Sequence, residues 1–409
     1  MVDSQNSKGY CSIIDCPTCE KLPSKMWFDL DRVGKDKIPA ELDQLSTVIS
    51  LDLETEHAYS SHTVKLLKCP RCGTYYYFSH YVDEGEHFMD PKSNDLTVRR
   101  YPPLTVIVFL EGIIKETPGT VPQPLGKLRK AFLEGTYPHP NEPVEEGRET
   151  IVELAGRELN ELKTRYEAII GEFIEIIEKR SPEWHIKKYI VDSLVLHFIN
   201  NEDWNSISKL LKHGDPVIRL ETLKNIVRYS TEDPSAVIDI MHVPYVTLPR
   251  MKINDIREKC AKILKKKGRM DEIIQVTVEL ALSDHGYTQE YDDLCGYSEY
   301  YRKPVQDVAL YCIVVLAEFA DFSKYIPQLV DLLSENEYLN YMVSWALGSI
   351  AEQNKENAKL ILKLINNKKR QMGDIISQDK EIQRLIKKCR EQQRAEKKTI
   401  NKKKRKKHS

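Results

Sequence analysis

The sequence predicts a mainly α-helical protein with a small α+β module at its N-terminus. Three observations support this fold class: two Cys-x-x-Cys pairs in the first hundred residues, a long helical periodicity after residue 145, and a pattern of paired helices that returns after residue 181. The 409 residues, of which 41% are hydrophobic and 30% charged, are enough for two or three packed domains.

The cysteine-rich module is expected to span residues 1–100, with "KLLKC" and "TYYYFSHYV" as short strands around a turn. Its two pairs are Cys16 with Cys19 and Cys69 with Cys72. Each spacing lets two thiolates reach one tetrahedral ion from a tight turn, which Pro70 and Gly73 favour in the second pair. The four cysteines therefore predict a structural Zn²⁺ site. The aromatic run after Cys72 is expected to pack a small core, because alternating strand residues share a face.

A Cys₄ site built from two such knuckles resembles a zinc ribbon. The forty-nine residues between the pairs exceed the usual ribbon gap of roughly 15–20, and Glu20 stands where the second knuckle has Gly73. A spare thiol or imidazole could replace one ligand; the candidates are Cys11, His57, His62, His80 and His87. Lys68 and Arg71 are expected to place positive charge beside the thiolates.

A thiol oxidoreductase is an alternative interpretation of the same pairs, since a helix N-terminus lowers the pKa of the first cysteine in a Cys-Pro-x-Cys motif. That chemistry needs a βαβ context, whereas the sequence predicts no clear helix after Cys19 and a strand after Cys72. Two pairs in one short region favour one metal ion over two redox centres. The chain also has no P-loop, dinucleotide-binding, metalloprotease or serine-hydrolase motif, so we expect no enzyme.

A proline-containing connector is expected at residues 101–145, followed by one long amphipathic helix at 146–180. The connector includes an apolar run, Leu104 to Ile114, which could be a strand or a short buried helix. The apolar stripe of the long helix is wider than a strict heptad seam. We therefore expect this helix to cover the neighbouring domain rather than to form a dimeric coiled coil.

Residues 181–386 are expected to form helical repeats. The clearest copy is "LLKHGDPVIRLETLKNI", in which Asp215 caps a helix and Arg219 follows an aliphatic residue. Arg257 occupies the same place in a second copy, and uncharged amides replace the arginine in two looser copies. The pattern resembles HEAT repeats. The resemblance implies an α-solenoid that binds partners on its surface rather than in a catalytic pocket.

A tyrosine-rich insertion interrupts these repeats between Leu282 and Lys303. Tyrosine is enriched at protein interfaces, and inserted segments of solenoids often lie on the binding face. The candidate partner-binding residues are Tyr287, Tyr291, Tyr297, Tyr300 and Tyr301. The alternative is that these side chains pack onto their own repeat.

The final segment, residues 387–409, holds twelve Lys or Arg and two Glu, a net charge of +10. Because the whole chain carries −1, residues 1–386 carry −11 (−1 minus +10). Such a basic block is expected to be disordered and could bind nucleic acid without sequence specificity. The sequence shows no secretory signal and no apolar run long enough to span a bilayer, so it predicts a cytoplasmic protein without a membrane partner.

Together these features predict a non-enzymatic scaffold or regulator that binds a protein partner and carries a structural zinc site. A nucleic-acid-binding protein that uses the zinc module and the basic tail is the first alternative. A thiol oxidoreductase that uses one Cys-x-x-Cys pair is the second.

Overall fold

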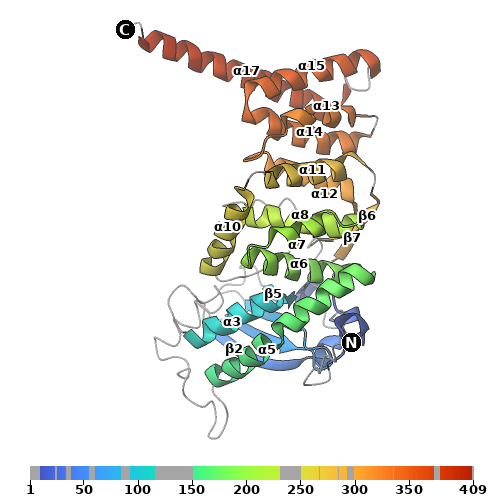
Figure 1. Ribbon diagram of the computed structural model, residues 1–409, viewed down its shortest axis with the longest axis vertical. Coiled ribbons are helices and arrows are strands. Elements are labelled where there is room, and N and C mark those ends of the chain that lie inside the picture. Colours follow the sequence, from blue (N-terminus) through green and yellow to red (C-terminus); the bar gives the residue numbers. More distant parts are fainter. Residues whose placement is uncertain are drawn as a thin grey trace. The chain divides into compact units, whose positions relative to one another are not determined.

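The computed structural model describes residues 10–23, 25–33, 38–54, 60–83, 93–115, 151–230, 250–266, 268–283, 285–292, 299–334, 336–372 and 378–407. These residues are mostly helical, with a small antiparallel sheet near the N-terminus (Figure 1). The chain forms two compact units: unit 1 is Met1–Trp204, His242–Cys260 and Gln289–Tyr301, and unit 2 is Asn205–Met241, Ala261–Thr288 and Arg302–Ser409. Within the described ranges, no helix combines the length and the apolar character needed to cross a membrane.

Unit 1 is built on a five-stranded antiparallel sheet in the order β1-β5-β4-β3-β2. The strands are β1 (Lys25–Asp29), β2 (Ser46–Glu54), β3 (Ser60–Lys68), β4 (Tyr75–Asp83) and β5 (Ser93–Tyr101). The two strands expected around the second cysteine pair are β3 and β4. Their register places Lys68 opposite Tyr75, so the hairpin presents both cysteines of that pair in its turn.

Short helical segments precede and follow the first strand. They are η1 (Ile13–Asp15), α1 (Pro17–Lys21), α2 (Leu30–Val33) and η3 (Ala40–Gln44). Pro17 suits the first turn of α1, because its fixed φ is already helical and it has no N–H to leave unsatisfied. This segment carries the first cysteine pair.

Three longer helices complete unit 1: α3 (Pro103–Lys115), α5 (Ile151–Lys179) and α6 (Trp184–Asn200). The apolar run whose conformation the sequence left open is helix α3. Its buried Val106, Phe109 and Leu110 recur at helical spacing and join the core of the sheet. Helix α5 packs on α3, β2 and α6, so it covers its own unit as its wide apolar stripe predicts.

The aromatic run of β4 alternates between two buried environments. Tyr75 and Tyr77 lie in the core beneath α3 and α5, and the ring of Tyr77 stacks on Tyr101 with 5.2 Å between centroids. Tyr76 is on the other face and is fully buried as well. The run therefore stabilises the fold and presents no free stack of rings.

Unit 2 is a succession of helices. They are α7 (Trp204–Leu211, whose first residue belongs to unit 1), α8 (Pro216–Ser230), α11 (Arg269–Leu282), α12 (Val305–Leu316), η5 (Ser323–Tyr325), α13 (Ile326–Asp331), α14 (Glu337–Gln353), α15 (Lys355–Met372) and α17 (Lys380–Lys407). Helix α10 (Arg250–Leu264) has residues in both units. Helix α8 contacts α11 and α12, α12 contacts α14, and α14 contacts α15 and α17 (Figure 1).

The basic C-terminal segment differs from the sequence-based expectation of disorder, because it continues helix α17 as far as Lys407. The first half of α17 is anchored on α14 and α15. Ile382, Leu385, Ile386 and Cys389 recur at helical spacing on its buried side. A helix that is already nucleated by packing adds further residues without a second nucleation cost.

The cysteine-rich module, the long helix α5 and helix α6 all belong to unit 1, and the helices of unit 2 follow Trp204. The tyrosine-rich insertion contains a two-stranded sheet, β6 (Tyr287–Asp292) with β7 (Glu299–Pro304). Residues 116–150, which include most of the expected connector, lie outside the described residues.

Leu162 of α5 is 1% exposed and lies in the core shared by α3, α5 and the sheet. We expect Leu162→Ala to lower the free energy of unfolding by about 2–5 kcal/mol, because the cavity it leaves adds to the lost transfer energy. Urea denaturation followed by circular dichroism measures the change. The neighbouring Lys163→Ala, at an exposed ion pair with Glu111, should cost less than about 1 kcal/mol. Equal effects of both substitutions would contradict the packing of α5 on this core.

Candidate metal centre

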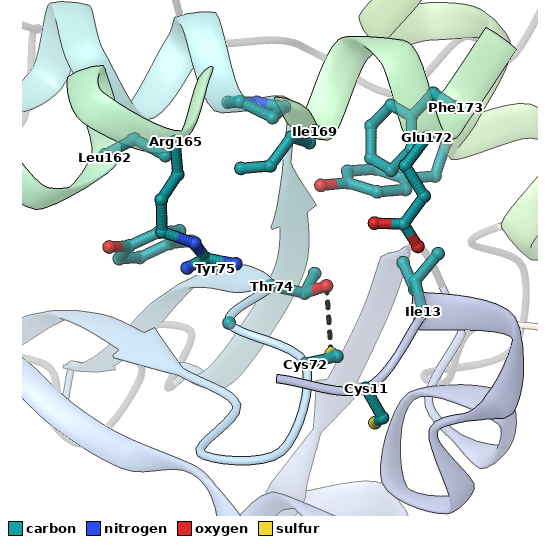
Figure 2. Close-up of a pocket in the computed structure, with 13 residues that line it drawn as sticks. Cys11, Ile13, Cys72, Thr74, Tyr75, Leu162, Arg165, Ile169, Glu172 and Phe173 are labelled. Atoms are coloured by element: carbon teal, nitrogen blue, oxygen red, sulfur yellow. Dashed lines mark hydrogen bonds between the residues drawn. The ribbon is translucent and has the colours of Figure 1, made fainter. Parts of the chain in front are cut away.

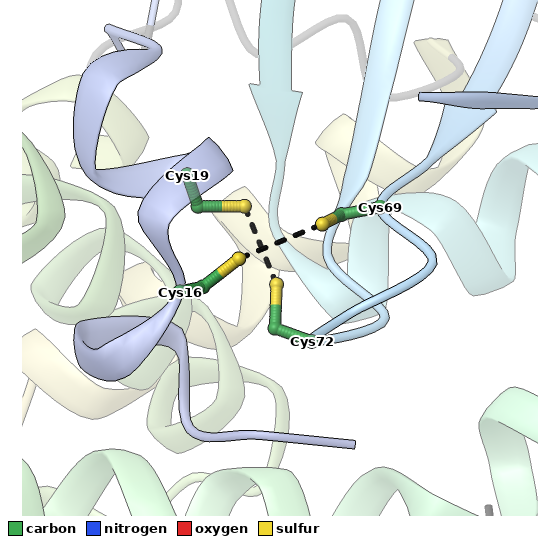
Figure 3. Close-up of side chains that lie close together, drawn as sticks. All are labelled: Cys16, Cys19, Cys69 and Cys72. Atoms are coloured by element: carbon green, nitrogen blue, oxygen red, sulfur yellow. Dashed lines mark hydrogen bonds between the residues drawn. The ribbon is translucent and has the colours of Figure 1, made fainter. Parts of the chain in front are cut away.

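The structure brings the four predicted cysteines together. The sulfur atoms of Cys16, Cys19, Cys69 and Cys72 all lie within 4.8 Å of one another (Figure 3). The Sγ atoms of Cys16 and Cys69 are 3.6 Å apart, and those of Cys19 and Cys72 are 3.3 Å apart. Each short contact joins one cysteine of the first pair to one of the second, so the two segments meet at a single point.

The second pair is held by a tight turn between β3 and β4. The N–H of Cys69 donates to the carbonyl of Thr74 at 2.8 Å, and the N–H of Gly73 donates to the carbonyl of Cys69 at 2.9 Å. Gly73 has a φ of 75°, a left-handed conformation that a residue with a Cβ rarely adopts. The glycine thus closes the turn that aims both sulfurs inward.

The first pair is held by the short helix α1. Cys16 is the residue before its first turn, and its carbonyl accepts the N–H of Glu20 at 2.9 Å. Cys19 lies within the same turn, which puts both sulfurs on the side that faces the second pair (Figure 3). The N–H of Cys11 donates to the carbonyl of Arg71 at 2.9 Å and so ties the N-terminal segment to the second turn.

The four thiols titrate as a group. Hydrogen bonds from the Cys19 and Cys72 thiols lower the pKa of Cys16 and of Cys69. Hydrogen bonds within the same group raise the pKa of Cys19 and of Cys72. A metal ion that replaces these shared protons would bind more tightly as the pH rises, because protons are released on binding.

The geometry fits a metal ion held by four thiolates. A tetrahedral ion with metal–sulfur bonds of about 2.3 Å separates its sulfur ligands by about 3.8 Å. The observed short distances of 3.6 and 3.3 Å need only small adjustments to reach that spacing. Three of the sulfur-bearing residues are 0% exposed and Cys72 is 9% exposed, so the site is closed by protein.

Arg100 of β5 supports the first cysteine pair and was not singled out in the sequence. Its Nη2 atom donates to the carbonyl of Cys19 at 2.7 Å and to that of Leu22 at 2.6 Å. Its guanidinium lies over the rings of Tyr76 and Tyr189, 5.4 and 5.3 Å from their centroids. A signal was present in the sequence, since Leu96, Val98 and Arg100 alternate along one buried face of β5.

Lys68 and Arg71 do not place positive charge beside the four sulfur atoms, as the sequence had suggested. The Nζ atom of Lys68 lies 2.8 Å from Glu158 Oε2 and 2.9 Å from Glu161 Oε1, both on α5. Tyr75 also donates to Glu158 at 2.9 Å, and the Arg71 side chain is exposed. Lys68 therefore joins the strand end next to Cys69 to α5, and Arg100 is the buried cation beside the sulfurs.

The spare ligands that the sequence left open are not part of the cluster in the described residues. His62 pairs with Ser79 and His80 with Asn94, each at 2.8 Å. Cys11 is partly exposed, and burial together with the nearby Cys16 raises the pKa of its thiol. His57 and His87 lie outside the described residues.

A small pocket reaches the centre from the side of α5 (Figure 2). It has a volume of about 30 Å³, which is room for roughly two water molecules. Cys11, Cys72 and Thr74 line one side, and Arg165 and Glu172 line the other. The Cys72 sulfur lies 3.2 Å from the Thr74 hydroxyl, so the most exposed ligand also has a polar partner in the pocket.

Of the repeat residues chosen from the sequence, Asp215 precedes α8, and Arg219 and Arg257 lie within α8 and α10. The Oδ1 atom of Asp215 accepts the N–H of Val217 at 2.8 Å at the start of α8. Arg219 forms an ion pair of 2.5 Å with Glu279 of α11, and Arg257 is half-buried in α10.

Of the five candidate tyrosines, Tyr287 is 59% exposed on β6. Tyr291, Tyr300 and Tyr301 lie in β6 and β7, but their side chains are outside the described part, as is the whole of Tyr297. The structure therefore places one of the five on the surface and does not bring the set together as a site.

Comparisons of the chain with protein-family models, with curated proteins and with solved structures found no match. The four-cysteine cluster is the metal-ligand group that the described residues contain.

The ligand set predicts different outcomes for two neighbouring cysteines. We expect the wild-type protein to bind one metal ion per chain and Cys16→Ser to lose it, because a hydroxyl is a poor substitute for a thiolate. Cys11→Ser should keep it. Elemental analysis of the purified full-length variants measures both, and the reverse pattern would make Cys11 the ligand in place of Cys16.

Arg100 is predicted to tune the affinity of the centre for its metal. Arg100→Met removes the donors that hold the first pair, so metal affinity should fall by roughly 10- to 100-fold. Arg99→Met is the matched control, because Arg99 is the preceding residue of β5 and lies on its other face. Its metal affinity should stay within about twofold of the wild-type value. Competition with a coloured chelator gives both affinities. Unchanged affinity in the Arg100 variant, with its fold verified by circular dichroism, would contradict this role.

Proposed function

We propose that this protein is a non-enzymatic scaffold that binds a protein partner through its helical surface and uses a structural Zn²⁺ ion to hold unit 1 together. The observation that carries the proposal is the contrast between the two units. The potential metal ligands of the described residues form one closed cysteine cluster in unit 1, whereas unit 2 is a succession of helices. A metal site with four protein ligands has no coordination position left for a substrate. Such a site is therefore structural rather than catalytic.

Zinc is the ion that this ligand set favours. Tetrahedral four-thiolate sites hold either zinc or an iron–sulfur cluster. A polynuclear cluster would keep its thiolates farther apart, because iron and sulfide atoms would lie between them. Sulfur atoms that all lie within 4.8 Å of one another suit a single ion.

A HEAT-like array is the arrangement that unit 2 supports best. Helix pairs follow one another along the chain, and each first helix contacts the next: α8 with α12, α12 with α14, and α14 with α17. Three of these four helices begin at a capping side chain, from Asp215, Asn336 and Asp379. Neighbour-to-neighbour packing of this kind leaves long surfaces open to partners.

The tyrosine-rich insertion is the proposed contact with the protein partner. Tyr287 is more than half exposed, whereas most large aromatic side chains of the described residues are buried. Tyrosine contributes large contact areas at interfaces and keeps a hydroxyl for hydrogen bonding. The short β6–β7 sheet gives the insertion a defined backbone from which to present its side chains.

The test is capture with the full-length, zinc-loaded protein from nuclease-treated extract, followed by purification of the captured protein. Replacing Tyr287, Tyr291, Tyr297, Tyr300 and Tyr301 together by alanine should weaken its binding by about 30-fold or more, measured by calorimetry. Deleting residues 395–409 should leave this binding unchanged. A purified partner that binds the alanine variant as tightly as the wild-type protein would contradict the assigned surface, and the absence of any stoichiometric partner would contradict the scaffold function.

A further inference from the structure

We infer that unit 2 carries a second binding surface, formed by aromatic side chains of α12 and α14 beside the basic helix α17, and that it binds single-stranded nucleic acid. We call the aromatic part of this surface the aromatic face. It consists of Tyr311, Tyr338, Tyr341 and Trp345. The inference does not depend on the proposed protein partner, because the two surfaces share no residue.

The aromatic face combines side chains of two neighbouring helices, α12 and α14. Tyr338, Tyr341 and Trp345 are spaced by three and four residues, so they share one face of α14. The ring of Trp345 lies 6.0 Å from that of Tyr341 and 5.3 Å from that of Tyr311 on α12. Tyr338 is 52% exposed and Tyr341 is 40% exposed, so the row is open to a ligand.

Positive charge begins next to this row. Lys388 of α17 lies against Gly348, one turn beyond Trp345, and its Nζ atom is 2.9 Å from Glu352 on α14. Gln392 also donates to the carbonyl of Glu352 at 3.1 Å, which keeps the start of the basic segment along α14. From this contact α17 continues to Lys407 (Figure 1) and carries a strongly basic sequence.

The charge of α17 fits a polyanion. Residues 387–407 include twelve Lys or Arg and two Glu, and Lys387, Arg390 and Arg394 are exposed among the described side chains. A helix with this charge density attracts phosphates and releases their counterions. Exposed rings beside such a helix suit unpaired bases, which stack on aromatic side chains irrespective of their sequence.

The composition of the exposed apolar surface favours nucleic acid over a protein helix. In the part of the chain that the structure describes, the large hydrophobic side chains that remain exposed are all aromatic: Tyr287, Phe319, Tyr338 and Tyr341. A groove for an amphipathic helix would expose aliphatic or methionine side chains as well. Rings next to cations are the arrangement that single-stranded nucleic acids select.

The test uses the full-length protein and a fluorescent single-stranded oligonucleotide of about 20 nucleotides and mixed sequence, at about 0.15 M salt. Wild-type protein should bind it, and should bind a duplex of the same sequence more weakly. Replacing Tyr338 and Tyr341 by alanine should weaken binding by about 5- to 150-fold for each base that no longer stacks, whereas replacing both by phenylalanine should keep the affinity within about twofold. Deleting residues 395–409 should reduce both the affinity and its salt dependence, by roughly 0.7 in log–log slope for each phosphate that the protein no longer neutralises.

Tyr287→Ala is the matched control, because this ring is exposed in the same unit but is not part of the aromatic face. It should leave oligonucleotide binding unchanged, and circular dichroism verifies that every variant is folded. The inference is overturned if wild-type protein fails to bind, if duplex binds as well as single strand, or if the alanine variant binds as tightly as wild type. It is also overturned if the alanine variant loses only a protein partner, since the aromatic face would then be a protein-docking surface.

Discussion

The convergence of four cysteine side chains is the constraint on which unit 1 depends. Cys16 and Cys69 are 53 residues apart, yet their sulfur atoms are 3.6 Å apart and surrounded by protein. A metal ion bound by these four side chains would add its binding free energy to the stability of the fold. The surrounding contacts depend on the same point. Lys68, next to Cys69, pairs with two glutamates of α5. Arg100 donates to the carbonyl group of Cys19 and lies over the ring of Tyr189 of α6. A metal ion held by these cysteines would therefore couple closure of the β3–β4 hairpin to the docking of α5 and α6.

Unit 2 is stabilised in a different way. It has buried aliphatic helix faces, side-chain caps at helix starts and contacts between successive helices. If these helices form the proposed array, each depends mainly on its neighbours, and the outer faces are available for function. The two proposed binding surfaces lie on such positions. The division of roles has a physical basis, because a closed metal site has no free coordination position, whereas a succession of helices exposes a large area.

Much of this organisation was accessible from the sequence. The Cys-x-x-Cys spacing predicted the four clustered cysteines, Gly73 predicted the left-handed turn, and the 3.6-residue period predicted the long helix α5.

Other features could not be predicted from the sequence. The run at 104–114 was equally compatible with strand and helix, since its residues are apolar on all sides. Strands β1, β2 and β5 were not predicted. Strand β1 has only five residues, and its partner β5 is distant in sequence. Composition alone could not show that the basic segment continues a helix that is anchored by packing.

The sequence by itself determined which residues could bind a metal, that one long amphipathic helix follows residue 150, and how charge is divided along the chain. Those properties are local, because they follow from spacing, periodicity and composition. Only the tertiary structure decided that the two cysteine pairs meet, that Arg100 rather than Lys68 lies beside them, and that Tyr311 and Trp345 form one aromatic face next to Lys388. Each of these depends on contacts between residues far apart in the sequence. Such contacts depend on packing and on the burial of charge in the whole fold. Local sequence patterns therefore cannot predict them.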